Sequence, residues 1–347
     1  MSHCCRPRVA LLGQGEQTER WASALREGAD VLPLPQQLSG EIDALVLASG
    51  VSDPFARAKE ALLAQVSVLY AAPFTLSPWQ AAALNELSQR QGRLLRFVEP
   101  FRYRPGFAFL RRLLEGREPF WRPVYLRTLC LAQPDGLLRI DELATEELAI
   151  CAALLDGEPR YLTAVAGRRD EVGDVCAAFL ILHYSEGPVV QCTVSLAEAT
   201  SARQLVAVTP DRTLIMDDLG PVASLRIIGG PEQEFSVEAP TTAPLGEGRG
   251  ERMVASAGRD FVVAEAERFL SAVAAGDPSP ANGDRWARVA ALWWAARQSM
   301  SFEGPMDVSH PAWQREETEP PRLRVIEGGG RTARTAWRRP SLTVVAR

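Results

Sequence analysis

The feature that most constrains the fold of this sequence is a buried-strand pattern that leads directly into a glycine turn and a helix. Residues 8–12 read Arg-Val-Ala-Leu-Leu, Gly13-Gln14-Gly15 follows at once, and a helix is expected over residues 19–26. Strand, glycine turn and helix in this order form the local structure that a dinucleotide site requires. Gly13 would make the tight turn, and Gly15 would let the backbone approach a pyrophosphate at the helix N-terminus.

Two features of a dinucleotide site are missing from this region. Thr18 replaces the third glycine, which would allow close packing of the helix against the strand. An acidic residue that binds a ribose hydroxyl is expected roughly 20 residues beyond the glycines, but the chain reads Pro35-Gln36-Gln37 there. Gln36 or Gln37 could hydrogen-bond a ribose without being a carboxylate. The sequence therefore leaves open a weak cofactor site and a βα turn without a ligand.

The rest of the chain falls into two patterns. Strands are expected at residues 30–34, 43–48, 66–70 and 93–98, and helices alternate with them over residues 55–64 and 77–90. This alternation predicts a parallel, doubly wound sheet. Beyond it the chain is rich in strands, and its alternation of apolar and polar residues is typical of a sheet covered on one face. The expected strands span residues 123–131, 161–166, 176–184, 189–196, 205–209, 214–217 and 223–228, whereas residues 241–258 read as a loop.

Composition excludes several classes of function. The net charge of −5 argues against a general nucleic-acid binder, and Lys59 is the only lysine among 38 basic residues. Chemistry that needs an amine is therefore nearly excluded. The six cysteines form no CxxC pair, which indicates buried thiols in a reducing compartment and no metal site. No apolar run approaches ~18 residues and the N-terminus lacks a signal peptide, so we expect a cytoplasmic protein without a membrane segment.

The order of these elements resembles the Gfo/Idh/MocA oxidoreductases, a family that includes glucose–fructose oxidoreductase and inositol dehydrogenase. The resemblance covers residues 8–308 and is carried by several motifs in order: Ala71-Ala72-Pro73, Arg102-Tyr103-Arg104-Pro105 and residues 179–187, 259–270, 276–278 and 304–308. It implies a Rossmann-type α/β domain over residues 1–118 and an α+β domain with a large open, mostly antiparallel sheet over residues 119–308. The outer face of that sheet commonly pairs subunits in the family, so a homo-oligomer is expected.

The resemblance also implies where catalytic groups should lie, and two of them are absent. The family has a lysine in a Glu-Lys-Pro motif beside the nicotinamide, and Ala72 occupies that position here. Lys59 lies in the preceding helix and reads as a surface residue. The candidate cofactor-binding residues implied by the resemblance and the glycine turn are Gly13, Gln14, Gly15, Ala48, Ala71 and Pro73.

The second catalytic element of the family is an Asp-x-x-x-His on the first helix of the second domain. Asp141 matches its aspartate, and the histidine position falls on Thr145, or on Glu146 if the gap moves. A glutamate could replace the histidine as a general acid or base if its pKa were raised. The alternative interpretation of Glu146 and Glu147 is a solvated helix face.

Arginines are the remaining polar residues expected near the cleft: Arg102 and Arg104 after the fifth strand, and Arg127 on a following strand. Guanidinium groups suit a carboxylate or phosphate ligand, but their pKa is too high for proton transfer. The sequence allows either a bound small anion or structural ion pairs.

Two functional hypotheses follow. The slightly preferred one is a catalytically impaired family member that acts as a binding or partner subunit and binds NAD or NADP weakly or not at all. The alternative is an active NAD(P)-dependent oxidoreductase that acts on a sugar-like or small hydroxy or keto substrate with replacement acid/base groups, for which Asp141, Glu146 and Arg102 are the candidates. Residues 309–347, which contain Gly328-Gly-Gly and an arginine-rich end, are predicted to be a linker and tail that could bind a protein partner.

Overall fold

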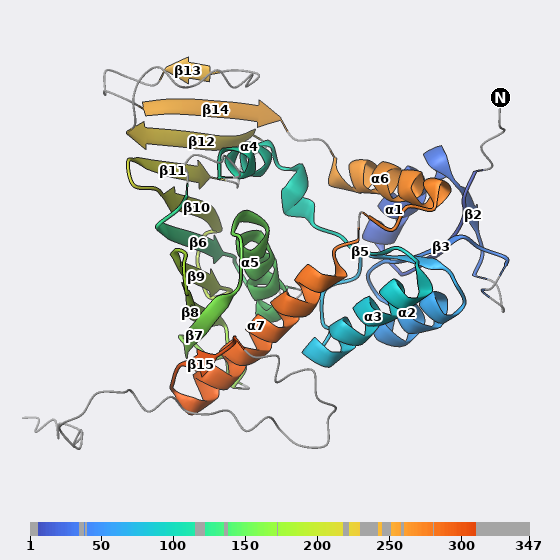
Figure 1. Cartoon of the computed structure of the whole chain (residues 1–347), viewed down its shortest axis with the longest axis horizontal. Coiled ribbons are helices and arrows are strands. Elements are labelled where there is room, and N and C mark those ends of the chain that lie inside the picture. Colours follow the sequence, from blue (N-terminus) through green and yellow to red (C-terminus); the bar gives the residue numbers. More distant parts are fainter. Residues whose placement is uncertain are drawn as a thin grey trace, which may run out of the picture.

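The computed structural model describes residues 6–34, 38, 40–114, 122–134, 138–171, 173–217, 222–229, 242–244, 251–257, 260–279 and 281–309. Gln36, Gln37 and the predicted tail from residue 310 onward lie outside these ranges. Figure 1 shows two sheets, one at each side of the molecule, with helices between and around them.

The first sheet is parallel and has five strands in the order β2-β1-β3-β4-β5. Its strands are β1 (Arg8–Leu12), β2 (Asp30–Leu32), β3 (Ala44–Leu47), β4 (Ser67–Tyr70) and β5 (Leu95–Phe97). Every residue of β3 and β4 is buried, as expected for a parallel sheet with helices on both faces. This arrangement confirms the predicted Rossmann-type fold.

Alternate residues of each strand divide the core into two layers. Leu45 and Leu47 face the side of helices α2 (Pro54–Leu63) and α3 (Pro78–Gln91), whereas Val46 faces the side of α1 (Glu16–Gly28). The predicted start of α3 is confirmed: Ser77 and Gln80 form a capping box and Pro78 occupies the first turn. A short 3-10 helix (Pro100–Tyr103) and α4 (Pro105–Leu114), which the sequence reading missed, lead to the second sheet.

The second sheet has ten strands in the order β13-β14-β12-β11-β10-β6-β9-β8-β7-β15, and only β6 and β9 pair in parallel. The strands are β6 (Tyr125–Leu131), β7 (Pro159–Ala166), β8 (Ala177–Tyr184), β9 (Val189–Ser195), β10 (Ala202–Val208), β11 (Arg212–Asp217), β12 (Val222–Gly229), β13 (Thr242–Pro244), β14 (Glu251–Ala257) and β15 (Met306–Asp307). The open, mostly antiparallel sheet predicted for this region is confirmed.

The loop prediction for residues 241–258 is wrong, because this segment contains β13 and β14. β14 pairs along its whole length with β12, from Val222↔Ala257 to Ile228↔Glu251. Its sequence has little strand pattern of its own, so pairing with a neighbouring strand determines its conformation.

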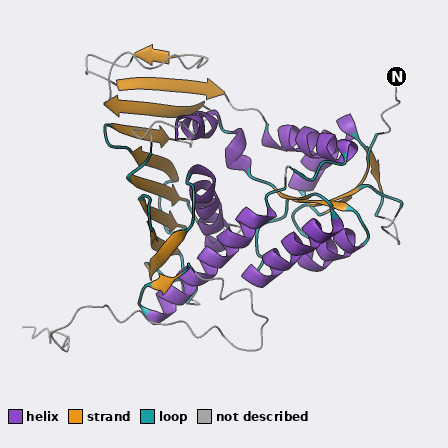
Figure 2. Ribbon diagram, in the orientation of Figure 1, coloured by secondary structure: helices purple, strands orange, loops and turns teal. Residues whose placement is uncertain are grey.

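All the helices that cover the second sheet lie on one of its faces (Figure 2). α5 (Ile140–Leu154) and α7 (Gly283–Phe302) pack there, and α7 continues to α3 of the first domain, while α6 (Phe261–Ala275) packs beside α1. Helices α6 and α7, which follow most of the second sheet in the sequence, thus pack against elements of the first domain. Among the described residues no helix is long and apolar enough to span a membrane.

Buried polar contacts fasten these returning helices to β5. Arg96 of β5 forms a bidentate ion pair with Glu265 of α6, and both side chains are at most 3% exposed. Asn282, at the start of α7, donates to the Phe97 carbonyl and accepts from its amide, each at 2.8 Å. Glu99 accepts from Arg285 of α7 at 2.9 Å.

We predict that Arg96→Met destabilises the protein by about 3–5 kcal/mol, because it leaves the Glu265 carboxylate buried without its guanidinium partner. Chemical denaturation at neutral pH measures the change. Glu60→Gln is the matched control, since Glu60 pairs with Arg57 at the surface with both side chains about half exposed, and exposed pairs contribute about 0–1 kcal/mol. Equal effects of the two variants would contradict the prediction.

The outer face of the second sheet carries a row of exposed apolar side chains. Val165 of β7, Phe179 and Ile181 of β8, and Val189 of β9 are 39–59% exposed on three adjacent strands. Contiguous apolar surface of this kind marks interaction sites. We propose that two copies of the chain pair through this face, as expected from the sequence.

Ile181→Asp should weaken self-association about tenfold or more, since a carboxylate in an apolar interface loses hydration without gaining a partner. Sedimentation or light scattering over a concentration series measures the dissociation constant. Leu63→Asp is the control, because Leu63 is 56% exposed on α2, in the first domain. A wild-type monomer at tens of micromolar, or equal effects of both variants, would overturn the pairing.

Candidate functional site

A cavity of about 380 Å³ lies at the carboxyl ends of β3, β4 and β5, where the first sheet faces α5. This edge of an open α/β sheet is where ligands usually bind. Ser49 follows β3, the Ala71-Ala72-Pro73 segment follows β4, and Val98 and Pro100 follow β5 on its wall. Gln17 and Trp21 of α1, Phe261 of α6 and Trp286 of α7 line it from one side, and residues of α5 from the other.

The Ala71-Ala72-Pro73 segment therefore borders the cavity, as the sequence comparison with the family predicted. Ala72 has no group that can move a proton at the position of the family lysine. Lys59 lies exposed on α2, as expected. None of the described residues that line the cavity is a lysine, arginine or histidine.

The glycine turn has the backbone that a phosphate-binding turn needs. Gly13 has no room for a side chain, because a Cβ there would lie 2.6 Å from Thr18 Oγ1 and 2.9 Å from the Ser49 carbonyl oxygen. Gly15 caps α1 with φ at +83°, and nothing lies within 4 Å of where its Cβ would be. The open space above Gly15 leaves the helix N-terminus accessible to an anionic group.

Other candidate cofactor residues lie around this turn. The Gln14 amide donates to the Ser49 carbonyl at 2.8 Å, which ties the turn to the end of β3. Ala48 is fully buried, so its side chain cannot contact a ligand, and the neighbouring Ser49 lines the cavity instead. Thr18 fills the place of the third glycine with its hydroxyl buried against Gly13 and without a hydrogen bond in the described structure.

The carboxylates that line the cavity come from one face of α5. Glu142, Thr145 and Glu146 line it together, because residues three and four apart share a helix face. The Thr145 hydroxyl donates to the Asp141 carbonyl at 2.8 Å, so its proton is engaged by the helix backbone. Sequence reasoning missed Glu142, although its spacing of four from Glu146 is the signal that could have found it.

Glu146 lies between two arginines from other elements. Its Oε1 is 3.1 Å from Arg203 Nη2 of β10 and 3.5 Å from Arg104 Nη2, which follows the 3-10 helix. Burial alone would raise the pKa of this carboxyl, but the two guanidinium charges outweigh it and hold the pKa below its usual value. The raised pKa that the sequence analysis required of a replacement acid/base group is therefore not found, and Glu146 is a carboxylate, which can accept a proton.

The alternative of a solvated helix face for Glu146 and Glu147 is wrong. The Glu147 side chain is 2% exposed, and its Oε1 accepts from Arg203 at 2.6 Å. Burial raises the pKa of Glu147, while Arg203 acts in the opposite direction. Both carboxylates lie in the interior because α5 is enclosed between the second sheet and the first domain.

The structure places Asp141 away from the cavity. Its carboxylate accepts from the Trp293 indole at 2.6 Å and lies near Arg139 and Arg297, at 3.8 and 3.6 Å. It lines a separate cavity of about 310 Å³ near the start of α5. The prediction that Asp141 and Glu146 act in one site is therefore not supported by their positions, because Asp141 bonds to α7.

The structure also corrects the predictions that placed Arg102 and Arg127 near the cleft. Arg102 forms a buried ion pair with Glu99, which also binds Arg285, and it does not line the cavity. Arg102 is thus one of the structural ion pairs that the sequence left open, and its candidate catalytic role lacks a position at the site. Arg127 is exposed on the outer face of the second sheet, beside Gln204, because it occupies an outward position of β6.

Aromatic rings form one wall of the cavity. Trp286 packs against Phe74 with ring centroids 4.6 Å apart, and both pack against Phe97, at 5.7 and 5.5 Å. Tyr70 completes the set at 5.0 Å from Phe97. A cavity lined by aromatic rings and two carboxylates suits a neutral ring that carries hydroxyl groups. No local pattern in the sequence predicted that Trp286 would line this cavity.

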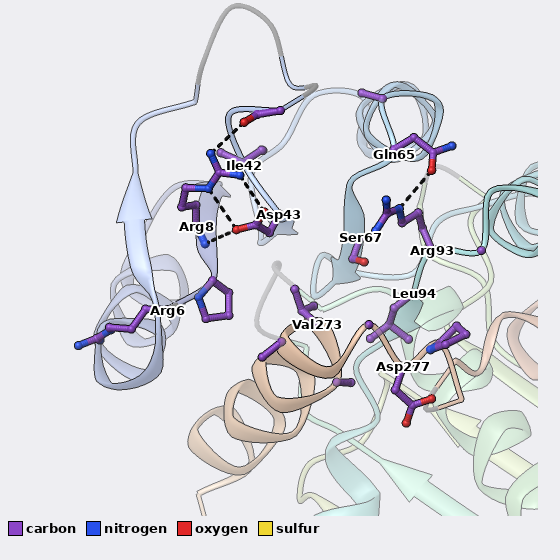
Figure 3. Close-up of a pocket in the computed structure, with 18 residues that line it drawn as sticks. Arg6, Arg8, Ile42, Asp43, Gln65, Ser67, Arg93, Leu94, Val273 and Asp277 are labelled. Carbon is purple, nitrogen blue, oxygen red and sulfur yellow. Dashed lines mark hydrogen bonds and ion pairs between the residues drawn. The ribbon is translucent and has the colours of Figure 1, made fainter. Parts of the chain in front are cut away.

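A larger cavity, of about 670 Å³, lies at the opposite, amino edge of the first sheet. Two of its arginines bind neighbouring side chains (Figure 3): Arg8 binds Asp43 through Nε and Nη2 at 3.2 and 2.9 Å, and Arg93 donates to Gln65 at 3.3 Å. The amino edge is not where parallel α/β sheets bind ligands. The smaller cavity is therefore the better candidate. Among the described residues, no cluster of His, Cys, Asp and Glu side chains could hold a metal ion.

Comparison with known proteins found dehydrogenases among the similar sequences and structures. The chain is 29% identical over 283 residues to the UDP-N-acetylglucosamine 3-dehydrogenase of Acidithiobacillus ferrooxidans, which covers 80% of this chain and 85% of the relative. The crystal structure of GnnA, the UDP-N-acetylglucosamine 3-dehydrogenase from that organism, superimposes with a TM-score of 0.70 at 24% identity, covering 85% of this chain and 98% of that one. No protein-family model matches the sequence.

Two further structures share the fold and contain a nicotinamide cofactor. GenD2 from gentamicin A biosynthesis in complex with NAD superimposes with a TM-score of 0.68 at 19% identity, covering 89% of this chain and 98% of that one. Levoglucosan dehydrogenase in complex with NADH has a TM-score of 0.69 at 14% identity, covering 87% and 99%. The sequence match to the dehydrogenase from Acidithiobacillus ferrooxidans agrees with the sheet order, the glycine turn and the position of the cavity. The chain thus has the fold of these NAD-binding oxidoreductases and is similar in sequence to the dehydrogenase from Acidithiobacillus ferrooxidans.

Proposed function

We propose that this protein is an NAD(P)-dependent dehydrogenase that oxidises a hydroxyl group of a sugar-like substrate, with Glu146 as the general base. The observation that carries the proposal is the position of an ionised glutamate on the wall of a cavity at the carboxyl edge of the first sheet. The relatives support it, since the ones compared above are named as dehydrogenases or contain NAD or NADH. This favours activity over the impaired subunit that we expected from Ala72.

In this reaction Glu146, the aromatic wall and the glycine turn have separate roles. Bound NAD would supply the acceptor for the hydride that leaves the carbinol carbon. Glu146 takes the hydroxyl proton, so that the alcohol becomes a ketone and one proton is released to the carboxylate. The aromatic wall of Phe74, Phe97 and Trp286 packs against the sugar ring and excludes water. Gly15 lets the pyrophosphate approach the amides at the start of α1.

The substrate class follows from the lining. Two carboxylates and no basic side chain on the described wall suit hydroxyl groups, which donate to carboxylates. The same lining disfavours a carboxylate or phosphate beside these glutamates, so the anionic ligand considered from Arg102 and Arg104 is not part of this proposal, and the diphosphate of a nucleotide sugar would lie outside this lining. UDP-N-acetylglucosamine is the first substrate to test because it is the substrate in the name of the relative at 29% identity.

Glu146→Gln should lower kcat by about 10²–10⁴-fold, the usual contribution of a positioned general base. Turnover is followed as NADH or NADPH formation with UDP-N-acetylglucosamine, levoglucosan and neutral hexoses. Asp141→Asn is the matched control, because an asparagine oxygen still accepts from Trp293 and Asp141 lies outside the cavity; it should change kcat less than about threefold. Equal losses in the two variants would refute the assignment of Glu146.

Cofactor binding is tested separately from turnover. Wild-type protein should bind NADH or NADPH with measurable affinity, and Gly15→Val should remove it, because a side chain would enter the space above the turn. Gly157→Val is the control: Gly157 has φ at +82° against +83° for Gly15, also has nothing within 4 Å of its Cβ position, and lies after α5. The two variants therefore carry similar backbone strain. Fluorescence titration measures binding, and equal losses would show that strain alone is responsible.

A second candidate function is a binding subunit without catalysis. It is favoured by Ala72, which lines the cavity in place of the family lysine. In that case the protein binds NADH, loses binding in Gly15→Val, and shows no turnover that depends on Glu146.

A further inference from the structure

The two carboxylate oxygens of Glu146 have different surroundings. Oε1 is buried and lies 3.1 Å from Arg203 and 3.5 Å from Arg104. The side chain as a whole is 25% exposed, and it lines the cavity. Because Oε1 is inaccessible, Oε2 is the oxygen that can reach a ligand.

Arg203 and Arg104 contact Glu146 from outside the cavity. Arg203 projects from β10, where its backbone is opposite Cys130 of β6, on the helix-covered face of the second sheet. Arg104 comes from the turn between the 3-10 helix and α4. Neither side chain lines the cavity. The charges that hold Glu146 are thus on the side away from the substrate.

We propose that Arg203 and Arg104 are positioning residues that hold Glu146 by Oε1 and thereby present Oε2 to the substrate hydroxyl. This inference rests on the proposed function, because it assigns the geometry of the same base. It requires no contact between either arginine and the substrate. It also explains why a glutamate, with more rotamers than a histidine, can act at a fixed point.

Arg203 also binds a second carboxylate, that of Glu147. Its Nη2 lies 2.6 Å from Glu147 Oε1 as well as 3.1 Å from Glu146 Oε1, so one guanidinium holds two successive carboxylates. Both contacts are made by the same nitrogen, whose two N–H groups can donate to two carboxylate oxygens. Fixing Glu147 in the interior fixes the rotation of α5, and hence the direction of its neighbour Glu146.

The same contacts determine the pH at which the base works. Arg104 and Arg203 lower the pKa of Glu146, whereas burial raises it. The other titratable groups near this cluster are Glu142 and Glu147 of α5 and Cys130 of β6, whose pKa is raised to about 12 by burial and which is a neutral thiol at pH 7. Removing one arginine should therefore raise the pKa of Glu146 and move the acid limb of kcat/KM to higher pH.

Arg104→Gln is the first test, because Arg104 is 27% exposed and its loss leaves Glu147 paired with Arg203. We expect kcat to fall about tenfold with KM changed less than twofold, and the acid limb to move up by about half a pH unit or more. Arg104→Lys should restore most of the limb position because it keeps the charge. Arg297→Gln, at an arginine 64% exposed beside Asp141, should change neither.

Arg203 needs a paired variant, since Arg203→Gln alone would leave Glu147 buried without its partner. Arg203→Gln combined with Glu147→Gln removes the charge and its countercharge together. The double variant should fold and show the same direction of shift as Arg104→Gln. Glu147→Gln alone is its reference, because it separates the effect of losing the Glu147 charge from the effect of losing Arg203.

A stability measurement tests the arrangement without turnover. A carboxyl with a depressed pKa in the folded protein stabilises it above the pKa of the unfolded chain, and this contribution is lost as pH falls through the folded pKa. In Arg104→Gln this contribution should be smaller and its loss should be complete at higher pH, and the difference should vanish when Glu146→Gln is added. Unfolding between pH 3 and pH 7 of the four proteins measures this coupling.

The outcomes separate the two proposals. Coupling between Arg104 and Glu146 without any turnover would reject the dehydrogenase and with it the substrate-facing role of Oε2. Turnover that depends on Glu146, with an acid limb and a stability profile unchanged in Arg104→Gln and in the paired Arg203 variant, would overturn the positioning role alone. Shifts in both measurements would support it.

Discussion

The buried polar contacts at β5 determine how the two halves of the molecule meet. Arg96 with Glu265, Asn282 with the backbone of Phe97, and Glu99 with Arg285 connect one short strand to the two helices that end the second segment. These groups are inside the protein, where an unpaired partner is costly, so the helices have one position rather than several. Because α7 also packs on α5, the glutamates of α5 face the ends of the first sheet.

The sequence predicted the fold well because its elements are locally encoded. Apolar runs such as Ala44–Leu47 and the capped start at Ser77 specify strand and helix without tertiary information. β14 was missed because its strand conformation depends on pairing with β12. The prediction of weak or absent cofactor binding from Thr18 and Gln36 remains a prediction.

The site was predicted in part. The sequence placed Ala72, Thr145 and Glu146 beside one another through the family pattern, and all three line the cavity. It misplaced Asp141 and Arg102 because the partners that bind them, Trp293 and Glu99, come from contacts that no local pattern reports. Trp286 and Arg203 were missed for the same reason, since each is brought to the site by a distant element.

The side chains of β10 point alternately to the two faces of the second sheet, and this restricts changes in the length of the strand. Arg203 points to the helix-covered face and the next residue, Gln204, points to the outer face, where it meets Arg127. Insertion or deletion of one residue in β10 would exchange the two faces. Glu147 would then have an amide in place of its guanidinium, and a second guanidinium would lie beside Arg127 on the outer face. Length variation among close relatives should therefore fall in the turns around β10 and leave the strand itself intact.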